Sequence, residues 1–132
     1  METARLVMSA FWALCQIAVC AVLLSVNWRA ANGRLPRNPR TGLRTAATIR
    51  SDRAWIAGHR AALRKTPLLL LVLVATLVAL LLVVLRTQTM APAMLAGCGG
   101  LIAFVPVAIY STVVANRAAK SVEDFPDDRK QP

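Results

Sequence analysis

The sequence predicts an all-α membrane protein: three transmembrane helices, with a short amphipathic interfacial helix in the first loop. The 132 residues are 57% hydrophobic and only 17% charged, whereas about a quarter of a soluble domain is charged. Uncharged stretches separate Arg5 from Arg29, Lys65 from Arg86, and Arg86 from Arg117. Each is long enough to cross a bilayer core, which takes about 20 apolar residues. We expect a single membrane domain over residues 1–132, because the longest polar stretch is too short to fold alone.

The first span is predicted over residues 6–26, with Trp12 and Trp28 near its two ends, where interfacial aromatic residues are favoured. A cleaved signal peptide is the alternative interpretation. Its apolar region is normally 7–15 residues long, and this one is longer. Glu2 also offsets Arg5, so the start of the chain is not strongly basic.

The second span, residues 67–85, begins sharply, because Thr66 can cap a helix and Pro67 suits its first turn. Thr76 is its only polar residue, so the helix is expected to face lipid over much of its surface.

The third span, residues 91–115, carries small residues on one side, which let helices approach closely in lipid. We interpret this side as a packing face against the first span or against a second copy of the chain. A hinge at Gly97–Gly100 and Pro106 is the alternative. The packing face consists of Ala93, Ala96, Gly97 and Gly100.

Basic residues fix the expected orientation, because Lys and Arg accumulate in cytoplasmic loops. The loop over residues 27–66 holds ten of them against Asp52 as its single acidic residue, whereas the connection between the second and third spans holds only Arg86. The tail, residues 116–132, adds four Lys or Arg and is expected to be disordered. The loop and the C-terminus should therefore be cytoplasmic and the N-terminus outside.

The second half of the loop predicts a helix over about 51–64, with Ser51 as its N-cap. Trp55, His59 and Ala62 share one face of it. A basic helix with a tryptophan on its apolar side is typical of the headgroup region of a membrane. Anionic headgroups of the bilayer are therefore the expected partner of this loop, at about 1 kcal/mol for each nearby cation.

Several function classes are disfavoured. The pI of about 11.3 makes nucleic-acid binding a candidate function, but the positive charge lies on one membrane-tethered loop without a recognition motif. His59 is the single histidine, and no nucleophile, carboxylate pair or metal cluster accompanies it. We therefore expect no enzyme, no catalytic residue, and no cofactor or metal. Cys15, Cys20 and Cys98 have no metal or disulfide spacing and suit small apolar filler. The predicted spans contain no ionisable residue besides cysteine and tyrosine, which disfavours an ion-coupled transporter.

The segment NPRTGLRTAATIRSDRAWIAGHR, residues 38–60, resembles the signature of the SdpI family of small bacterial membrane proteins. That signature reads N-x-x-x-G-x-R-T-x-x-T-x-x-(S/N)-x-x-x-W-x-x-x-(H/N)-R and lies between two spans. Many members carry an acidic residue where Arg53 stands, and longer members have additional N-terminal spans. The matching residues are Asn38, Gly42, Arg44, Thr45, Thr48, Ser51, Trp55, His59 and Arg60.

The resemblance implies a non-enzymatic immunity or signalling component of the cell membrane. The founding member is associated with immunity to a secreted peptide toxin and with holding a transcriptional repressor at the membrane. A peptide toxin or a cytoplasmic protein is therefore an expected partner. The alternatives are a structural accessory subunit that docks through the small residues of the third span and, more remotely, a small transporter. The signature loop itself either staples the helices together or docks a partner, for which Arg44 offers a bidentate contact to a carboxylate or phosphate.

Overall fold

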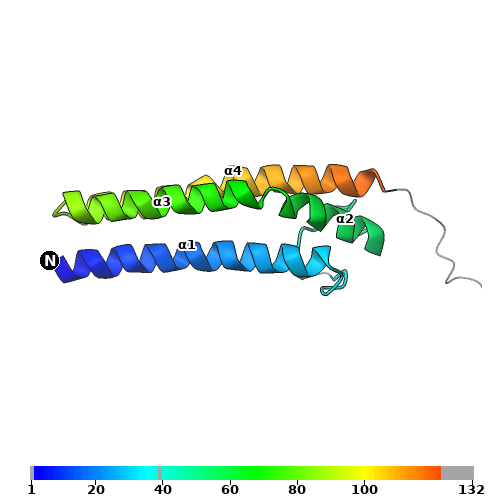
Figure 1. Ribbon diagram of the computed structural model, residues 1–132, viewed down its shortest axis with the longest axis horizontal. Helices are drawn as coiled ribbons and strands as arrows, with labels where there is room; N and C mark the ends of the chain where they lie inside the picture. The colour runs from blue at the N-terminus through cyan, green and yellow to red at the C-terminus, as the bar shows by residue number, and fades with distance from the viewer. Residues whose placement is uncertain (1, 39, 123–132) are drawn as a thin grey trace, which may run out of the picture. The chain divides into compact units, whose positions relative to one another are not determined.

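The computed structural model describes residues 2–38 and 40–122, and this part of the chain is helical without any strand. Its helices are α1 (Glu2–Ala31), α2 (Asp52–Leu63), α3 (Thr66–Arg86) and α4 (Ala91–Lys120) (Figure 1). Three helical segments, which include α1, α3 and α4, are long and apolar enough to cross a membrane. The prediction of an all-α fold with three helices suited to crossing a membrane is thereby confirmed.

The chain forms two compact units. The first, here the membrane unit, comprises Met1–Ser25 and Lys65–Tyr110. The second, here the loop unit, comprises Val26–Arg64 and Ser111–Pro132, of which residue 39 and residues 123–132 lie outside the described part. Helices α1 and α4 contribute to both units, whereas α3 belongs to the membrane unit and α2 to the loop unit.

Helix α1 runs from Glu2 to Ala31, beyond both ends of the predicted span over residues 6–26, so Arg5 is part of the helix. One prediction is wrong. Helix α4 continues through Lys120, although a disordered tail was expected from residue 116. Alanines are strong helix formers, and Arg117 and Lys120 favour the negative end of the helix dipole. The rest of that predicted tail, residues 123–132, lies outside the described residues.

The start of α3 also differs in detail. Pro67 occupies the first turn as predicted, but Thr66 is already helical, and Lys65 precedes the helix without a side-chain capping bond.

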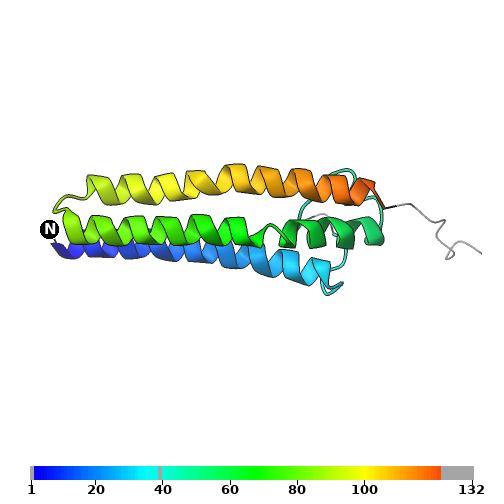
Figure 2. The same ribbon diagram turned by 45° about the horizontal axis from the view of Figure 1, so that its top comes forward.

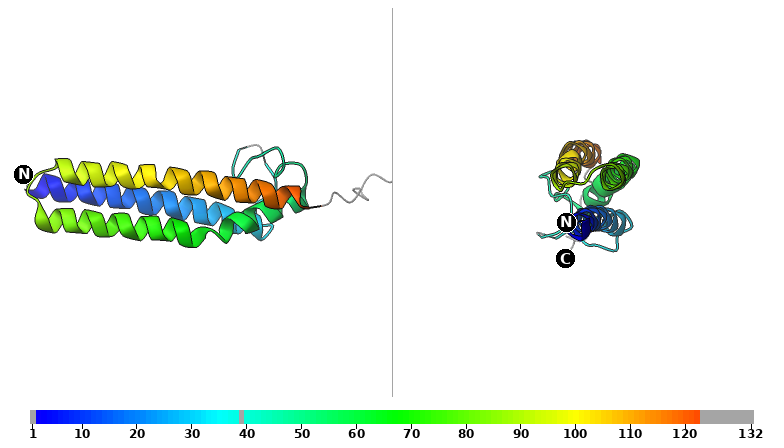
Figure 3. Two further views of the ribbon diagram at one scale, coloured as in Figure 1. Left: turned by 90° about the horizontal axis from the view of Figure 1, so that it is seen from above. Right: turned by 90° about the vertical axis from the view of Figure 1, so that its left-hand side faces the viewer.

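In the membrane unit, α1, α3 and α4 lie side by side, as the views in Figures 2 and 3 agree. One side chain from each helix forms the apolar centre: Cys20, Leu69 and Phe104, all about 4% exposed. Large apolar side chains such as Leu71 and Leu95 point outward instead, at 65% and 74% exposure. An apolar exterior of this kind suits contact with lipid tails.

The small residues of α4 lie against the other membrane helices. Ala93, Gly97 and Gly100 are buried and Ala96 is half-buried. A side chain added at Gly97 would run into Trp12, and one added at Gly100 would run into Thr76 and Gln16. Helix α4 is continuous through Gly97–Gly100 and Pro106. In this arrangement Gly97 packs against α1, and Gly100 packs against α1 and α3.

Candidate functional site

The signature segment begins with turns that its own side chains stabilise. The Asn38 side-chain oxygen accepts hydrogen bonds from the backbone N–H groups of Arg40 (3.0 Å) and Thr41 (2.7 Å). Ser51 caps α2, because its hydroxyl accepts the N–H of Ala54 at 3.1 Å. Both side chains replace backbone partners that a turn or a helix start lacks.

Gly42 is needed for two reasons. Its φ of +107° lies in a region that residues with a Cβ rarely adopt. A Cβ there would also lie 2.6 Å from the Trp55 ring and 2.8 Å from His59 Nε2. The backbone therefore approaches the two rings as closely as only glycine allows.

Trp55 and His59 form the centre of the loop unit, at 1% and 0% exposure and with ring centroids 4.2 Å apart. The Trp55 indole N–H donates to the Leu35 carbonyl at 3.0 Å. His59 Nε2 accepts the Leu43 N–H at 3.0 Å, so Nδ1 carries the proton and donates to the Trp55 carbonyl at 2.8 Å. This ring face of α2 is therefore covered by the signature loop, which corrects the expectation that it lies against lipid.

The His59 imidazole is held neutral. Burial lowers its pKa below the ordinary value of 6.5, and the hydrogen bond to the Trp55 carbonyl partly opposes that shift. With both nitrogens bonded to backbone, His59 is arranged as a structural link and not as a general base.

Thr48 ties the middle of the loop together and is fully buried. Its hydroxyl donates to the Leu43 carbonyl at 2.6 Å and accepts the Thr45 N–H at 2.9 Å. Its methyl group lies against Gly58 of α2, where an added Cβ would come within 2.7 Å. Thr48 therefore links the non-helical part of the loop to α2, and none of its side chain is exposed.

Arginines of the loop bond the ends of the long helices. Arg60 Nε donates to the Ala31 carbonyl at the end of α1 at 3.0 Å. Arg50 donates to the carbonyls of Ala119 (3.4 Å) and Val122 (2.9 Å) at the end of α4. Helix ends leave such carbonyls without intrahelical partners. Arg50 was not singled out from the sequence, because its role depends on where α4 ends.

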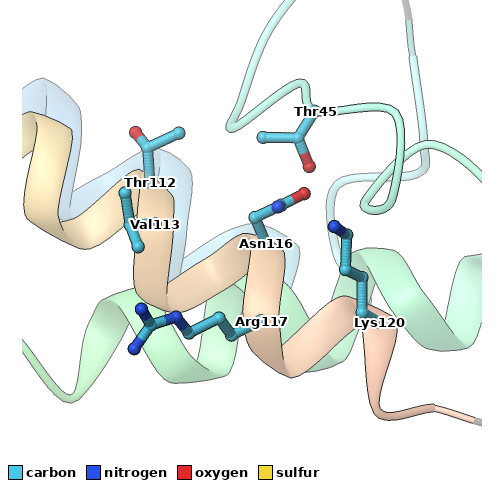
Figure 4. A pocket seen from close by; sticks show the side chains of 6 residues that line it. All are labelled: Thr45, Thr112, Val113, Asn116, Arg117 and Lys120. Atoms are coloured by element: carbon cyan, nitrogen blue, oxygen red, sulfur yellow. The ribbon is translucent and has the colours of Figure 1, made fainter.

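Arg44 is the exception in the signature. Its side chain is exposed, and it makes no hydrogen bond or ion pair within residues 2–38 and 40–122. Its neighbour Thr45 is half-buried and lines an open cavity of about 340 Å³ within the loop unit (Figure 4). The other lining residues come from α4: Thr112, Val113, Asn116, Arg117 and Lys120.

The cavity is suited to an anionic group. Its lining carries the cations of Arg117 and Lys120, together with an amide and two hydroxyls. Figure 4 shows Asn116 and Lys120 extending toward the loop that carries Thr45, whereas Arg117 extends along α4 toward Val113. Sequence reasoning missed Asn116, Arg117 and Lys120 because it placed them in a disordered tail. The run NRAAK, which continues the helix pattern, was the available signal.

Comparison with known proteins agrees with the signature. The model of the SdpI/YfhL protein family matches residues 34–114, which include the whole signature, α2, α3 and most of α4. No curated protein and no solved structure matches the chain. The family match covers more than half of the chain and, together with the three apolar helices, makes this a multi-pass membrane protein. The chain therefore belongs to the SdpI/YfhL protein family.

Proposed function

We propose that this protein is a non-enzymatic member of its family that protects the cell against a membrane-active peptide or relays the presence of that peptide. The observation that carries the proposal is a division of labour within the signature. The fold of the loop depends on contacts of Gly42, Thr48, Trp55 and His59, whereas the Arg44 side chain is exposed. A side chain that the fold does not use is available to a partner.

The outward group has a defined chemistry. The guanidinium of Arg44 can hold a carboxylate or phosphate with two parallel hydrogen bonds. The neighbouring Thr45 lines a cavity with two further cations, Arg117 and Lys120. The partner on this side should therefore present acidic groups, either from a cytoplasmic protein or from anionic lipid headgroups. The excess of basic residues in the loop supports a cytoplasmic position for it, with the N-terminus outside.

The accessory-subunit alternative has less support. It requires the small residues of α4 to dock another protein. In the membrane unit Gly97 and Gly100 are already buried against Trp12, Gln16 and Thr76. A docking partner would need to use the apolar outer faces of the helices instead.

The test is the sensitivity of a deletion strain to secreted membrane-active peptides, with complementation from a plasmid. The deletion should raise sensitivity, and the wild-type gene should restore resistance. Arg44→Ala should fail to restore it, although the protein accumulates in the membrane. Arg40→Ala is the matched control, because Arg40 is an exposed arginine at a variable position of the signature, and it should restore resistance. Unchanged sensitivity of the deletion strain to every peptide would contradict the proposed function.

A further inference from the structure

One face of α1 carries a row of polar side chains inside the membrane unit. Arg5, Ser9, Trp12 and Gln16 are spaced four, three and four residues apart, which places them on one side of a helix. Arg5 is 5% exposed, Ser9 6% and Gln16 0%. We refer to these four residues as the polar row. An arginine buried in a membrane helix is rare and usually functional.

The polar row has unused hydrogen-bonding capacity. Within the described part of the chain, Arg5 Nε and Nη1, Ser9 Oγ, Trp12 Nε1 and Gln16 Oε1 are buried and have no hydrogen-bond partner. Among residues 2–38 and 40–122, the row makes one side-chain hydrogen bond, from Gln16 Nε2 to the Gly97 carbonyl at 3.3 Å. Unpaired polar groups are costly where lipid surrounds a protein, so the row is expected to have a partner that the chain itself does not supply.

The polar row ends on an apolar cluster in one direction along α1 and reaches the N-terminal end of the helix in the other. One turn beyond Gln16 the same face reaches Cys20, which packs with Leu69 and Phe104 into the apolar centre. Arg5, at the opposite end, lies in the first turns of α1, and the connection between α3 and α4 lies at that same end of the membrane unit (Figures 1 and 3). A row that ends on an apolar cluster suits a binding site better than a path through the membrane.

The free groups define the ligand. Guanidinium and indole nitrogens can only donate, and a serine hydroxyl donates readily. The free Gln16 Oε1 is an acceptor instead, lies at the inner end of the row, and is not assigned to the ligand. Donors that include a fixed positive charge call for an acceptor with negative charge, and the planar guanidinium matches a carboxylate bidentately. Because the row is at least 94% buried at Arg5, Ser9 and Gln16, a slim group must enter end-on. A carboxylate has one substituent, whereas a lipid phosphodiester has two.

We propose that the polar row is a binding site for a carboxylate, held by Arg5 with Ser9 and Trp12 as further donors and reached from the N-terminal end of α1. This inference rests on the proposed function, because it assigns to the row the carboxyl terminus of the membrane-active peptide. Arg5 lies just before the predicted first span, residues 6–26, but within α1, which begins at Glu2.

The test uses the full chain in phosphatidylcholine nanodiscs and NMR of the tryptophan indole N–H groups, with dodecanoate, dodecanamide and dodecyl phosphate as probes. The Trp12 signal is assigned with Trp12→Phe, and Trp28 and Trp55 serve as internal references. Dodecanoate should shift the Trp12 signal saturably and leave that of Trp55 in place, while dodecanamide should not shift it. Equal shifts from the amide, no shift from dodecanoate, or binding of dodecyl phosphate alone would overturn the proposal.

Variants locate the site. Arg5→Gln should weaken dodecanoate binding at least tenfold, whereas Arg86→Gln, an exposed arginine at the same end of the membrane unit, should leave it unchanged. Since Arg5→Gln can perturb folding, Ser9→Ala is a second, milder variant and should weaken binding about threefold or more. Wild-type affinity in a well-folded Arg5→Gln variant would overturn the assignment. Wild-type affinity in both single variants Ser9→Ala and Arg5→Lys would overturn it as well.

The two proposals fail separately. Dodecanoate binding measures the polar row without any peptide or cell. If the probe does not bind but the deletion strain is sensitive to a peptide, the inference is wrong and the proposed function stands. If the probe binds and the deletion strain is not sensitive, the site is real and the proposed function is wrong.

Discussion

Replacing Gly42 with alanine should unfold the signature loop locally, and the structure allows the size of the effect to be worked out. The backbone at Gly42 has a φ of +107°, which costs an L-residue about 1–2 kcal/mol. The new Cβ would also lie 2.8 Å from His59 Nε2, so the imidazole must move away from the Leu43 N–H. A buried donor that loses its partner costs about 1–3 kcal/mol.

Together these costs are about 2–5 kcal/mol, and each 1.4 kcal/mol is a factor of ten in an equilibrium constant. Backbone amides of the loop and α2 should therefore exchange with deuterium roughly 30 to 4,000 times faster in Gly42→Ala than in the wild type. Hydrogen exchange followed by mass spectrometry on protein in nanodiscs measures this rate for each peptide segment.

Gly33→Ala is the matched control for this experiment. Gly33 also has a positive φ, of 70°, but an added Cβ meets only Ile56, at 4.0 Å. It should show the backbone cost of about 1–2 kcal/mol without the displacement of His59. Equal exchange rates in Gly42→Ala and Gly33→Ala would refute the argument that the glycine is required by the ring contact.

Three further predictions follow from the same contacts. Because burial lowers the His59 pKa, the unfolded loop binds a proton more readily than the folded loop. The protection of loop amides against exchange should therefore be full above pH 6.5 and fall below that pH. In His59→Gln this pH dependence of protection should disappear. Thr48→Val keeps the volume but leaves the partners of the hydroxyl unpaired, so a urea titration should show a loss of about 1–3 kcal/mol. Gly97→Ala should reduce the free energy of unfolding by about 1–3 kcal/mol through overpacking against Trp12, and so lower the melting temperature, whereas Gly99→Ala, with open space, should not.

Much of the fold can be predicted from this sequence because a helix that crosses a bilayer needs about 20 consecutive apolar residues. Three long uncharged stretches give three helices, and Ser51 as a helix cap depends only on neighbouring residues. The helix ends were harder to place. Hydropathy marks where a helix leaves lipid, but α4 continues through polar residues, because Arg50 bonds its last carbonyls from 69 and 72 positions away in the sequence.

The candidate site was only half predictable for a related reason. The spacing of Trp55 and His59 shows that they share a helix face, but amphipathicity alone does not tell whether lipid or protein covers that face. The folded loop brings Gly42 close to both rings, so protein rather than lipid covers that face. The burial of Arg5 was equally hidden, since it depends on helices that are distant in the sequence.

The central claim is that the signature separates into residues that fold the loop and an outward Arg44 that serves a partner. Hydrogen exchange of the loop and α2 in Arg44→Ala tests it most directly. The exchange rates should equal those of the wild type, because no described residue bonds to this side chain. Faster exchange across the loop in Arg44→Ala, comparable to that of Gly42→Ala, would show that Arg44 is part of the scaffold and would contradict the claim.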